Sequence, residues 1–567
     1  MYTTATALLE AMIEQGIEYL FVNLGSDHPG LVEAIARARA HGQPVPHVVT
    51  CPNEMVALSI AHGFAQVTGR PQAVVVHVEC GTQALAGAIH NAAKARIPVL
   101  IFAGSSPFTQ EGELLGSRNE FIQWIQDVHD QRGLVRGYMR YDNEIRTGSN
   151  VKQLVHRAMQ FARSEPKGPV YLMAAREVLE ASCAPVAVDM ARWQPVALPV
   201  LGAANAAWLA ARLAEAKRPL IVTSYLGRNP AAVRQLAALC TRLGIGLLES
   251  VPSYVNLPHD HPSYLGNSWN EPQQNAALAE ADLVLVIDSD VPWIPTKSRP
   301  PEAALVCHID IDPLKDQMPL WYIEPHRVFR ADAELALAEI ADALGAIAID
   351  EAATTERRDH YAALSAARRA RLASDEAPQA GLTVARLMAS VRAHVDADTI
   401  VLNEAITNYP VVFDHLAPSC PGAMFASGGG SLGWNGGAAI GAKLARPGAT
   451  VVAITGDGSY MFTVPSSVHW IARRYDAPFL QIVLNNKGWN APRHSALAVH
   501  PSGYASQASD LDIGFDPAPD YGGIAAASGG AAGIVVDRDS DIDAAIAHAF
   551  SILRTEQRSV VLEARLG

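Results

Sequence analysis

The sequence has little of what ties a protein to a membrane, a disulfide framework or a polyanion. Its six cysteines stand singly, without a C-x-x-C pair, which is typical of a reduced intracellular protein without structural zinc. No apolar run approaches the roughly 20 residues that a membrane span needs. The net charge is −13 and there is no run of lysine or arginine, so neither nucleic acid nor an anionic membrane is an expected partner.

The first residues also lack the basic segment and apolar core of a signal peptide, so we expect a soluble, cytoplasmic protein. Hydrophobic residues make up 49% of the chain and charged residues 18%, a composition that allows large buried cores. The chain has 567 residues, which is too long for one domain at roughly 150 residues per domain.

Apolar runs of strand length alternate with helical patterns along the chain, and many of these runs end in polar or glycine-rich turns. This alternation predicts an α/β fold with three doubly wound parallel-sheet domains. The expected domains are residues 1–185, 190–345 and 381–567, with a helical connector at 346–380. The expected strands are 19–24, 46–50, 73–78, 99–103 and 169–172, then 219–223, 283–287 and 306–311, then 399–402, 451–455 and 479–484.

Oxygen-bearing side chains follow two strands of the third domain. The strand 451–455 runs into the turn Gly456-Asp457-Gly458, and the strand 479–484 ends at Asn485-Asn486. If these strands are parallel neighbours, Asp457 and Asn486 lie at the same sheet edge, where open α/β sheets bind ligands. A carboxylate, an amide oxygen and a backbone carbonyl from the next turn suit Mg²⁺, which takes its remaining oxygens from phosphates and water.

This layout resembles the diphosphate-anchoring motif of thiamine-diphosphate enzymes. The resemblance implies that Asp457, Asn486 and the Gly488 carbonyl hold Mg²⁺, which holds the diphosphate of the cofactor. It also implies contacts from neighbouring residues of the same two turns, which are Gly456, Gly458, Ser459 and Trp489.

The order of the domains resembles the acetolactate synthase-like superfamily, which includes pyruvate and benzoylformate decarboxylases, over almost the full length. The resemblance implies an N-terminal pyrimidine-binding domain, a central domain and a C-terminal diphosphate-binding domain. It also implies a homodimer or homotetramer with active sites between subunits. The matching stretches include Glu54 with 62–65 and 68–71, then 97–104, 261–266, 308–313 and 427–441.

The same resemblance assigns the groups that act on the cofactor. Glu54 matches the glutamate that gives a carboxyl proton to the aminopyrimidine ring, and Gln83 matches a polar position beside the cofactor. Leu432 matches the apolar wedge that folds the cofactor into a V shape. The Gly430 carbonyl then accepts a hydrogen bond from its 4′-amino group.

The substrate pocket is expected between the two domains. Ser26, Asp27 and His28 follow the first strand, where relatives place a polar residue against the reacting group. Trp489 and Asn490 follow the metal loop, over the thiazolium position in relatives. His77 precedes the exit loop expected at 79–83, and the catalytic candidates are Glu54, His28, His77 and Asn490.

The expected reaction is cleavage or formation of a C–C bond next to a carbonyl in a small 2-oxo acid or related substrate, through a thiamine-bound enamine. A diketone-cleaving hydrolase of the cyclohexane-1,2-dione type, which His28 and His77 favour, and a 2-hydroxyacyl-CoA lyase stay open. A simple pyruvate decarboxylase is disfavoured, because its His-His pair has no counterpart at 115–119 and its glutamate none at 491–493.

Three further hypotheses concern cofactors and turnover. The stretch 288–292 lacks the Gly-Ala-Arg of flavin-binding synthases, which makes FAD doubtful. Gly428, Gly430 and Gly433 form a G-x-G-x-x-G pattern that an NAD(P)-binding dehydrogenase would use. The third hypothesis is a binding or regulatory homologue without turnover, although the presence of Glu54 and Asp457 argues against it.

Overall fold

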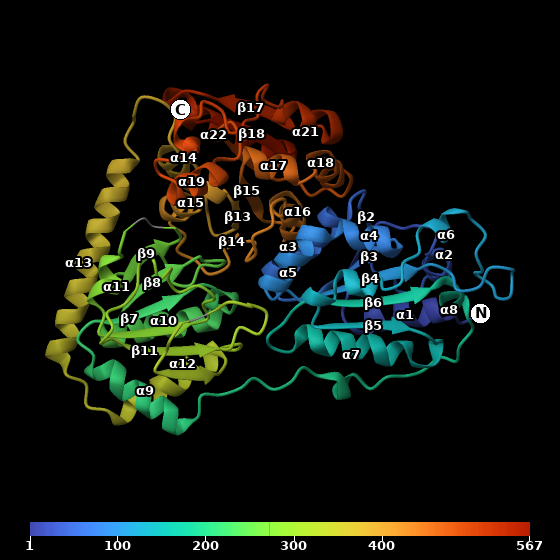
Figure 1. The fold of residues 1–567 in the computed structure, drawn as a ribbon, viewed down its shortest axis with the longest axis horizontal. Coiled ribbons are helices and arrows are strands. Elements are labelled where there is room, and N and C mark those ends of the chain that lie inside the picture. Colours follow the sequence, from blue (N-terminus) through green and yellow to red (C-terminus); the bar gives the residue numbers. More distant parts are fainter. Residues whose placement is uncertain (271–272, 322, 567) are drawn as a thin grey trace.

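Three six-stranded parallel sheets flanked by helices follow one another along the chain (Figure 1). The structure is a computed structural model and describes all residues except 271, 272, 322 and 567. The predicted fold class, three parallel-sheet α/β domains, is confirmed. No helix in the described part of the chain is long and apolar enough to cross a membrane.

The first sheet has the strand order β2-β1-β3-β4-β6-β5. The sequence did not predict β5, because its polar residues 141–144 lack an apolar run and it lies at the edge of the sheet. Residues 79–83, expected to form a loop, instead lie in the helix α4, and the preceding strand already ends at Val76. The strands are β1 Tyr19–Val22, β2 His47–Thr50, β3 Gln72–Val76, β4 Val99–Ser105, β5 Tyr141–Ile145 and β6 Val170–Ala175, and the helices are α1 Thr4–Glu14, α2 Pro29–Ala40, α3 Glu54–Thr68, α4 Val78–Ala84, α5 Ala86–Lys94, α6 Ile122–Ile125, α7 Val151–Arg163 and α8 Arg176–Glu180.

An extended segment, residues 181–202, leads to the second sheet, and its one 3₁₀ turn is Met190–Trp193. This sheet has the order β12-β11-β10-β7-β8-β9. The long helix α13, Glu351–Asp375, then runs along the outside of the domain (Figure 1). The strands are β7 Pro219–Thr223, β8 Gly246–Ser250, β9 Tyr264–Ser268, β10 Leu283–Ile287, β11 Leu305–Asp310 and β12 Arg327–Arg330, and the helices are α9 Ala203–Glu215, α10 Pro230–Leu243, α11 Ala276–Glu280 and α12 Ala333–Ala343.

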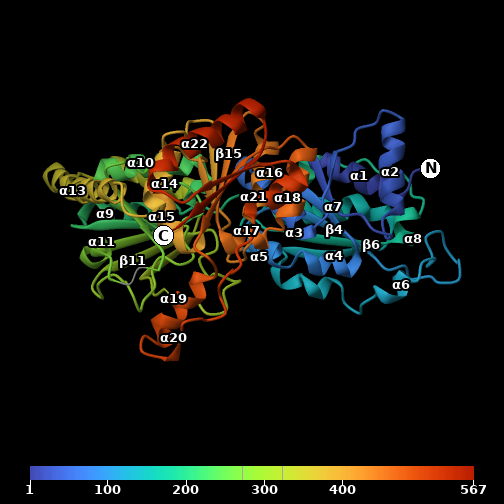
Figure 2. The ribbon, with the colours of Figure 1, turned by 90° about the horizontal axis from the view of Figure 1, so that it is seen from above.

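The third sheet has the order β14-β13-β15-β16-β18-β17. Its helices α19 and α20 project from the body of the molecule (Figure 2), and none of their residues is buried. The strands are β13 Thr399–Glu404, β14 Met424–Ala426, β15 Thr450–Gly456, β16 Leu480–Asn485, β17 Ala532–Val536 and β18 Val560–Arg565, and the helices are α14 Val384–Arg392, α15 Tyr409–Leu416, α16 Asn435–Ala445, α17 Asp457–Phe462, α18 Pro465–Arg474, α19 Asn490–Val499, α20 Tyr504–Gln507, α21 Tyr521–Gly529 and α22 Ile542–Ser551.

The first and third domains meet where α3 packs against α16 (Figure 1). The two backbones approach so closely that a Cβ atom on Gly441 would lie 2.1 Å from the carbonyl oxygen of Ile60. One hydrophobic core continues across this contact and contains residues of both helices, including Val56 and Ala438. Because α3 begins at Glu54 and α16 follows Leu432, this contact brings the candidate residues of both domains together.

Candidate active site

The Asp457 carboxylate lies at the carboxyl end of β15, beside the end of β16. The two strands are parallel neighbours, as predicted, and Gly456 pairs with Leu484. The carboxylate is buried and accepts hydrogen bonds from the Gly458 N–H and the Gly488 N–H, each at 2.8 Å. Burial raises the pKa of Asp457 above its ordinary value, although these N–H groups oppose the rise. A cation at this position would therefore stabilise the ionised form.

The two asparagines after β16 have different environments. Asn485 is buried, donates to Glu563 Oε1 at 2.7 Å and accepts from the Lys487 N–H at 2.9 Å. The Oδ1 atom of Asn486, by contrast, is buried and has no hydrogen-bond partner among the described residues. An unpartnered amide oxygen beside a buried carboxylate fits an oxygen-ligated Mg²⁺, so these residues fit the predicted metal.

Thr407 is a neighbour of this edge that the sequence analysis missed. Its hydroxyl oxygen lies 3.5 Å from Asn486 Nδ2, and it follows β13, which pairs with β15. A polar residue just beyond a third strand of the same sheet is the signal that could have identified it.

The loop that follows β16, residues 486–490, is held in place by residues farther along the chain. Gly488 has φ 143°, and a Cβ atom there would lie 2.1 Å from the Ile513 carbonyl oxygen, so only glycine fits. The same carbonyl accepts from the Trp489 N–H at 2.8 Å. Asn490 donates its N–H to the Gly488 carbonyl and its side-chain amide to the Asn486 carbonyl, both at 3.1 Å. In this structure Asn490 therefore stabilises the loop.

Glu54 begins α3, after the cap residue Asn53, whose side chain accepts from the Val56 N–H. Its carboxylate oxygen Oε1 accepts from Asn23 Nδ2 at 2.8 Å. Burial raises the pKa of Glu54 above its ordinary value, against the hydrogen bonds from its own N–H and from Asn23. A carboxyl group that retains its proton more readily is suited to giving a proton to a ring nitrogen.

Asp27, His77 and Gln126 form a line of hydrogen bonds beside Glu54. The His77 Nδ1 atom lies 2.5 Å from Asp27 Oδ1, and its Nε2 atom lies 2.9 Å from Gln126 Oε1. The hydrogen bond with Asp27 raises the pKa of His77 against the effect of burial, and the charge of Glu54 adds to the rise. Because an oxygen atom lies beside each nitrogen, His77 can donate from both nitrogens when both carry a proton. The sequence offered no signal for Gln126, which lies in the irregular segment after α6.

His28 and Asp27 are packed tightly at the same strand exit. His28 is fully buried and accepts the Gly25 N–H at Nδ1 (3.1 Å), and no residue that the structure describes bonds to its Nε2 atom. Burial alone would raise the pKa of Asp27, but the adjacent His28 and His77 outweigh it and hold this pKa well below its usual range. Asp27 also accepts a hydrogen bond from the Val78 N–H at 3.0 Å, and Val78 has a strained backbone φ of 31°.

Three other predicted residues differ from one another in their exposure to solvent. Ser459 is buried in the first turn of α17, next to Asp457. Gln83 is exposed, and its amide donates to Glu79 within α4. Ser26 is half-buried in the turn before Asp27.

The loop that carries Gly430 and Leu432 lies between the two domains. Gly433 meets the side chain of Met55, the residue after Glu54, because a Cβ on Gly433 would lie 2.9 Å from Met55 Cε. Glu404 accepts the N–H groups of Gly433 at 2.7 Å and Asn435 at 2.8 Å, which fixes the end of this loop to β13. Leu432 is therefore placed near the start of α3.

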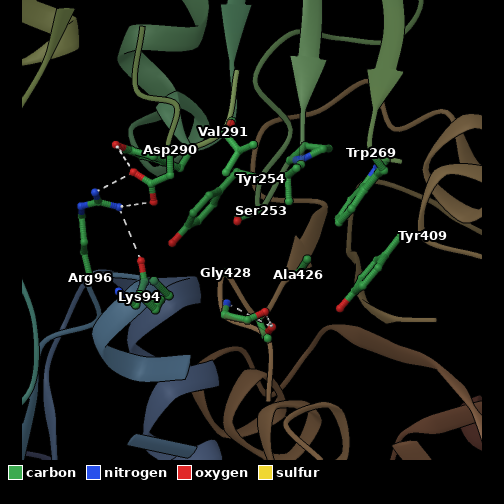
Figure 3. A pocket seen from close by; sticks show the side chains of 18 of the residues that line it. Lys94, Arg96, Ser253, Tyr254, Trp269, Asp290, Val291, Tyr409, Ala426 and Gly428 are labelled. Atoms are coloured by element: carbon green, nitrogen blue, oxygen red, sulfur yellow. Dashed lines mark hydrogen bonds and ion pairs between the residues drawn. The ribbon is translucent and has the colours of Figure 1, made fainter. Parts of the chain in front are cut away.

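A cavity of about 300 Å³ opens behind this loop, where all three domains meet (Figure 3). One wall is the backbone of residues 428–430, and another is the stacked pair of Trp269 and Tyr409, whose ring centroids are 4.4 Å apart. Arg96 and Asp290 form an ion pair at the rim, with Arg96 above the Tyr225 ring. The charged side chains at this end of the central sheet are therefore paired with one another.

Comparisons with known proteins agree with this geometry. Residues 2–134 match the thiamine pyrophosphate enzyme N-terminal TPP binding domain, 206–318 the central domain, and 405–564 the C-terminal TPP binding domain. The chain therefore belongs to the thiamine pyrophosphate enzymes, of the superfamily that includes acetolactate synthases and benzoylformate decarboxylases. The predicted family and enzyme class are confirmed, and the NAD(P)-dehydrogenase hypothesis is set aside.

Several named proteins are similar to the chain over most of its length. A probable 2-ketoarginine decarboxylase of Pseudomonas aeruginosa is 28% identical, covering 90% of this chain and 87% of the relative. A benzoylformate decarboxylase of the same organism is 26% identical, covering 87% and 88%. A solved Rhodococcus jostii thiamine diphosphate-dependent 4-hydroxybenzoylformate decarboxylase has a TM-score of 0.77 at 22% identity, covering 100% and 99%. This last likeness supports the fold.

Proposed function

We propose that the enzyme binds thiamine diphosphate through Mg²⁺ and releases CO₂ from a 2-oxo acid to form an aldehyde. In this proposal Asp457, Asn486 and the Gly488 carbonyl hold the metal, and Thr407 faces the diphosphate. When bound, the cofactor accepts the electron pair that cleavage leaves on the carbonyl carbon. The remaining work falls to groups of the protein.

Glu54 and the Gly430 loop prepare the cofactor for reaction. Glu54 shares its proton with the pyrimidine ring, and its raised pKa favours the form that can do so. With the cofactor bound, the Gly430 carbonyl would accept a hydrogen bond from its 4′-amino group, and the Leu432 side chain would support the cofactor from below. Half-buried Met55 and buried Val56, in the first turn of α3, keep water from this contact.

The observation that carries the decarboxylase proposal is the Asp27-His77-Gln126 line. An enzyme that releases an aldehyde must place a proton on the carbon that lost CO₂, and His77 is held ready to donate one. Asp27 stays ionised beside it and favours the charged form of the imidazole, which takes up a new proton from solvent after each turnover. Two relatives, a probable 2-ketoarginine decarboxylase and a benzoylformate decarboxylase, support the same reaction class.

Carboligation is a second candidate, because acetolactate synthases match most of the chain. A probable acetolactate synthase large subunit of Methanocaldococcus jannaschii is 25% identical, covering 85% of this chain and 80% of the relative. In that reaction a second carbonyl compound takes the place of the proton. The diketone-cleaving hydrolase stays a third candidate on the strength of His28 and His77.

The test separates CO₂ release from aldehyde release. Enzyme loaded with thiamine diphosphate and Mg²⁺ is given a panel with 2-ketoarginine, benzoylformate, pyruvate and cyclohexane-1,2-dione, and the products are identified by mass spectrometry. We expect CO₂ and an aldehyde from one of the 2-oxo acids. In His77→Gln, we expect aldehyde release to slow by about 100-fold while the first equivalent of CO₂ still forms.

A hydroxyketone as the main wild-type product would favour carboligation, and ring opening of the dione would favour the hydrolase. Glu302→Gln, an exposed change in the central domain, serves as the control and should retain the wild-type products.

We also propose that two copies of the chain assemble with the Glu54 domain of one facing the Asp457 domain of the other. The resemblance to the superfamily supports this arrangement. The extended segment 181–202 supports it too, because such a linker lets the first domain be exchanged between copies while α3 and α16 keep the same contacts.

A further inference from the structure

Two side chains of α5 hold the backbone of the loop that carries Gly430. Asn91 is buried, accepts the Ser431 N–H at Oδ1 (3.0 Å) and donates from Nδ2 to the Ser431 carbonyl (2.8 Å). The neighbouring His90 accepts the Gly430 N–H at Nε2 (3.1 Å). These bonds join the N-terminal domain to the backbone of the C-terminal domain.

Because the peptide bond is planar, the hydrogen bond between Asn91 and the Ser431 N–H also sets the direction of the Gly430 carbonyl. The Ser431 N–H and the Gly430 carbonyl belong to one trans peptide unit, so they point in opposite directions. Binding the N–H to Asn91 therefore turns the Gly430 carbonyl away from α5. The second bond fixes the peptide unit between Ser431 and Leu432, and with it the start of the wedge residue.

We propose that Asn91 is a positioning residue that sets the direction of the Gly430 carbonyl and the place of Leu432. This inference rests on the proposed cofactor site, since that carbonyl is the acceptor for the 4′-amino group. It predicts that the cofactor is activated only when α5 lies against the loop. The start of the cofactor reaction thus depends on contact between the two domains.

The rest of the loop shows why Asn91 is needed. Glu404, from the same domain, holds the far end through the Gly433 and Asn435 N–H groups. The Gly430–Ser431 part is instead held by α5 of the other domain. Gly87, one turn before Asn91, leaves room for Ser431, because a Cβ there would lie 1.9 Å from the Ser431 hydroxyl oxygen.

The C-terminal end of α5 is itself anchored. Arg96, two residues beyond the helix, makes two hydrogen bonds to the Asp290 carboxylate, at 2.9 and 3.1 Å. Its guanidinium lies 4.4 Å from the centroid of the Tyr225 ring. The central domain therefore fixes the helix that presents Asn91 to the loop (Figure 3).

The experiment compares Asn91→Leu, Asn91→Asp and Gly87→Ala with the wild type in the full chain. The first change removes both bonds at similar volume, and the second keeps an acceptor for the Ser431 N–H but loses the donor. The third keeps Asn91 and displaces Ser431. Asn205→Asp in α9, where the side-chain amide donates to the Leu201 carbonyl just before the helix and far from the Gly430 loop, is the matched control.

Three readouts are taken. Hydrogen exchange of the Ser431 amide in the cofactor-free chain reports on its hydrogen bond to Asn91. Calorimetry gives the affinity for thiamine diphosphate with Mg²⁺. Quenched NMR gives the rate of proton exchange at C2 of the bound cofactor. We expect Asn91→Leu to lose protection at Ser431 and to slow C2 exchange by about 10- to 100-fold. Asn91→Asp should keep the protection and slow C2 exchange less, and Gly87→Ala should slow it with Asn91 intact.

The outcomes separate the two proposals. Wild-type C2 exchange in a folded Asn91→Leu chain that has lost the Ser431 protection would overturn the positioning role while the cofactor site stands. Unchanged protection at Ser431 would also overturn it. If the wild type itself neither binds the cofactor nor exchanges the C2 proton, the proposed function fails instead.

Discussion

The two sheet edges that meet at the site differ in how their charged groups are satisfied. At the N-terminal edge, Asp27 and His77 form an ion pair within the protein, and Glu54 has a side-chain partner. At the C-terminal edge, within the described part of the chain, backbone N–H groups are the only donors to Asp457, and Asn486 Oδ1 has no partner. In the proposed function the first edge moves protons, whereas the second receives a cation.

This difference predicts that substitutions at the two edges have different effects on the enzyme. Loss of a proton-handling group should leave binding intact and slow the chemistry. Loss of the cation-binding carboxylate should remove the cofactor itself. The predictions below test this separation, beginning with the largest effect.

Glu54→Gln should slow C2 proton exchange by at least about 100-fold, because an amide cannot supply the carboxyl proton. Affinity for thiamine diphosphate should change little, since the metal edge is untouched. Quenched NMR measures the exchange and calorimetry the affinity, with Glu302→Gln as the control. Wild-type exchange in the variant would leave Glu54 with only the role of a first-turn residue in α3.

Asp457→Ala should weaken cofactor binding by at least about 100-fold. EDTA should have a comparable effect on the wild type, because the oxygen shell works only with the cation present. Calorimetry with and without EDTA measures both, and Asp260→Ala, an exposed change in the central domain, is the control. If the wild type binds equally well in EDTA, the metal assignment is wrong.

The sequence predicted the C-terminal edge better than the N-terminal one, for a physical reason. Asp457 and Asn486 follow apolar strands in a fixed local pattern, so parallel pairing was enough to bring them together. Gln126 reaches His77 from an irregular segment, and no local pattern places it there. The edge strand β5 was missed because polar residues at the margin of a sheet need not follow the pattern of a buried strand.

A mixture of inactive Glu54→Gln and Asp457→Ala chains should regain about a quarter of wild-type activity after unfolding and refolding together. Half of the dimers would be hybrids, and each hybrid would have one site with both groups intact. The α3–α16 contact of this structure would then form between chains, with the same residues. Persistent inactivity, with hybrids confirmed by native mass spectrometry, would place each site within one chain.

The Asp27–His77 pair should give the stability a dependence on pH. The pKa of His77 is raised in the folded state, so its contribution is full below about 6.5 and is lost as pH rises through the folded value. The pKa of Asp27 is lowered, so its contribution is full above about 3.9 and is lost as pH falls through the folded value. The pair should therefore stabilise the fold most between about pH 4 and 6.5.

Asp27→Asn tests this directly. At pH 5.5 we expect it to lower the free energy of unfolding by about 2 kcal/mol, and at pH 9 by less, because the contribution of charged His77 is lost as pH rises through its folded pKa. Urea unfolding at both pH values measures the difference, and Asp260→Asn should change neither. A loss of equal size at both pH values would mean that Asp27 acts through the Val78 N–H, which does not titrate, and that His77 carries no charge in the folded protein.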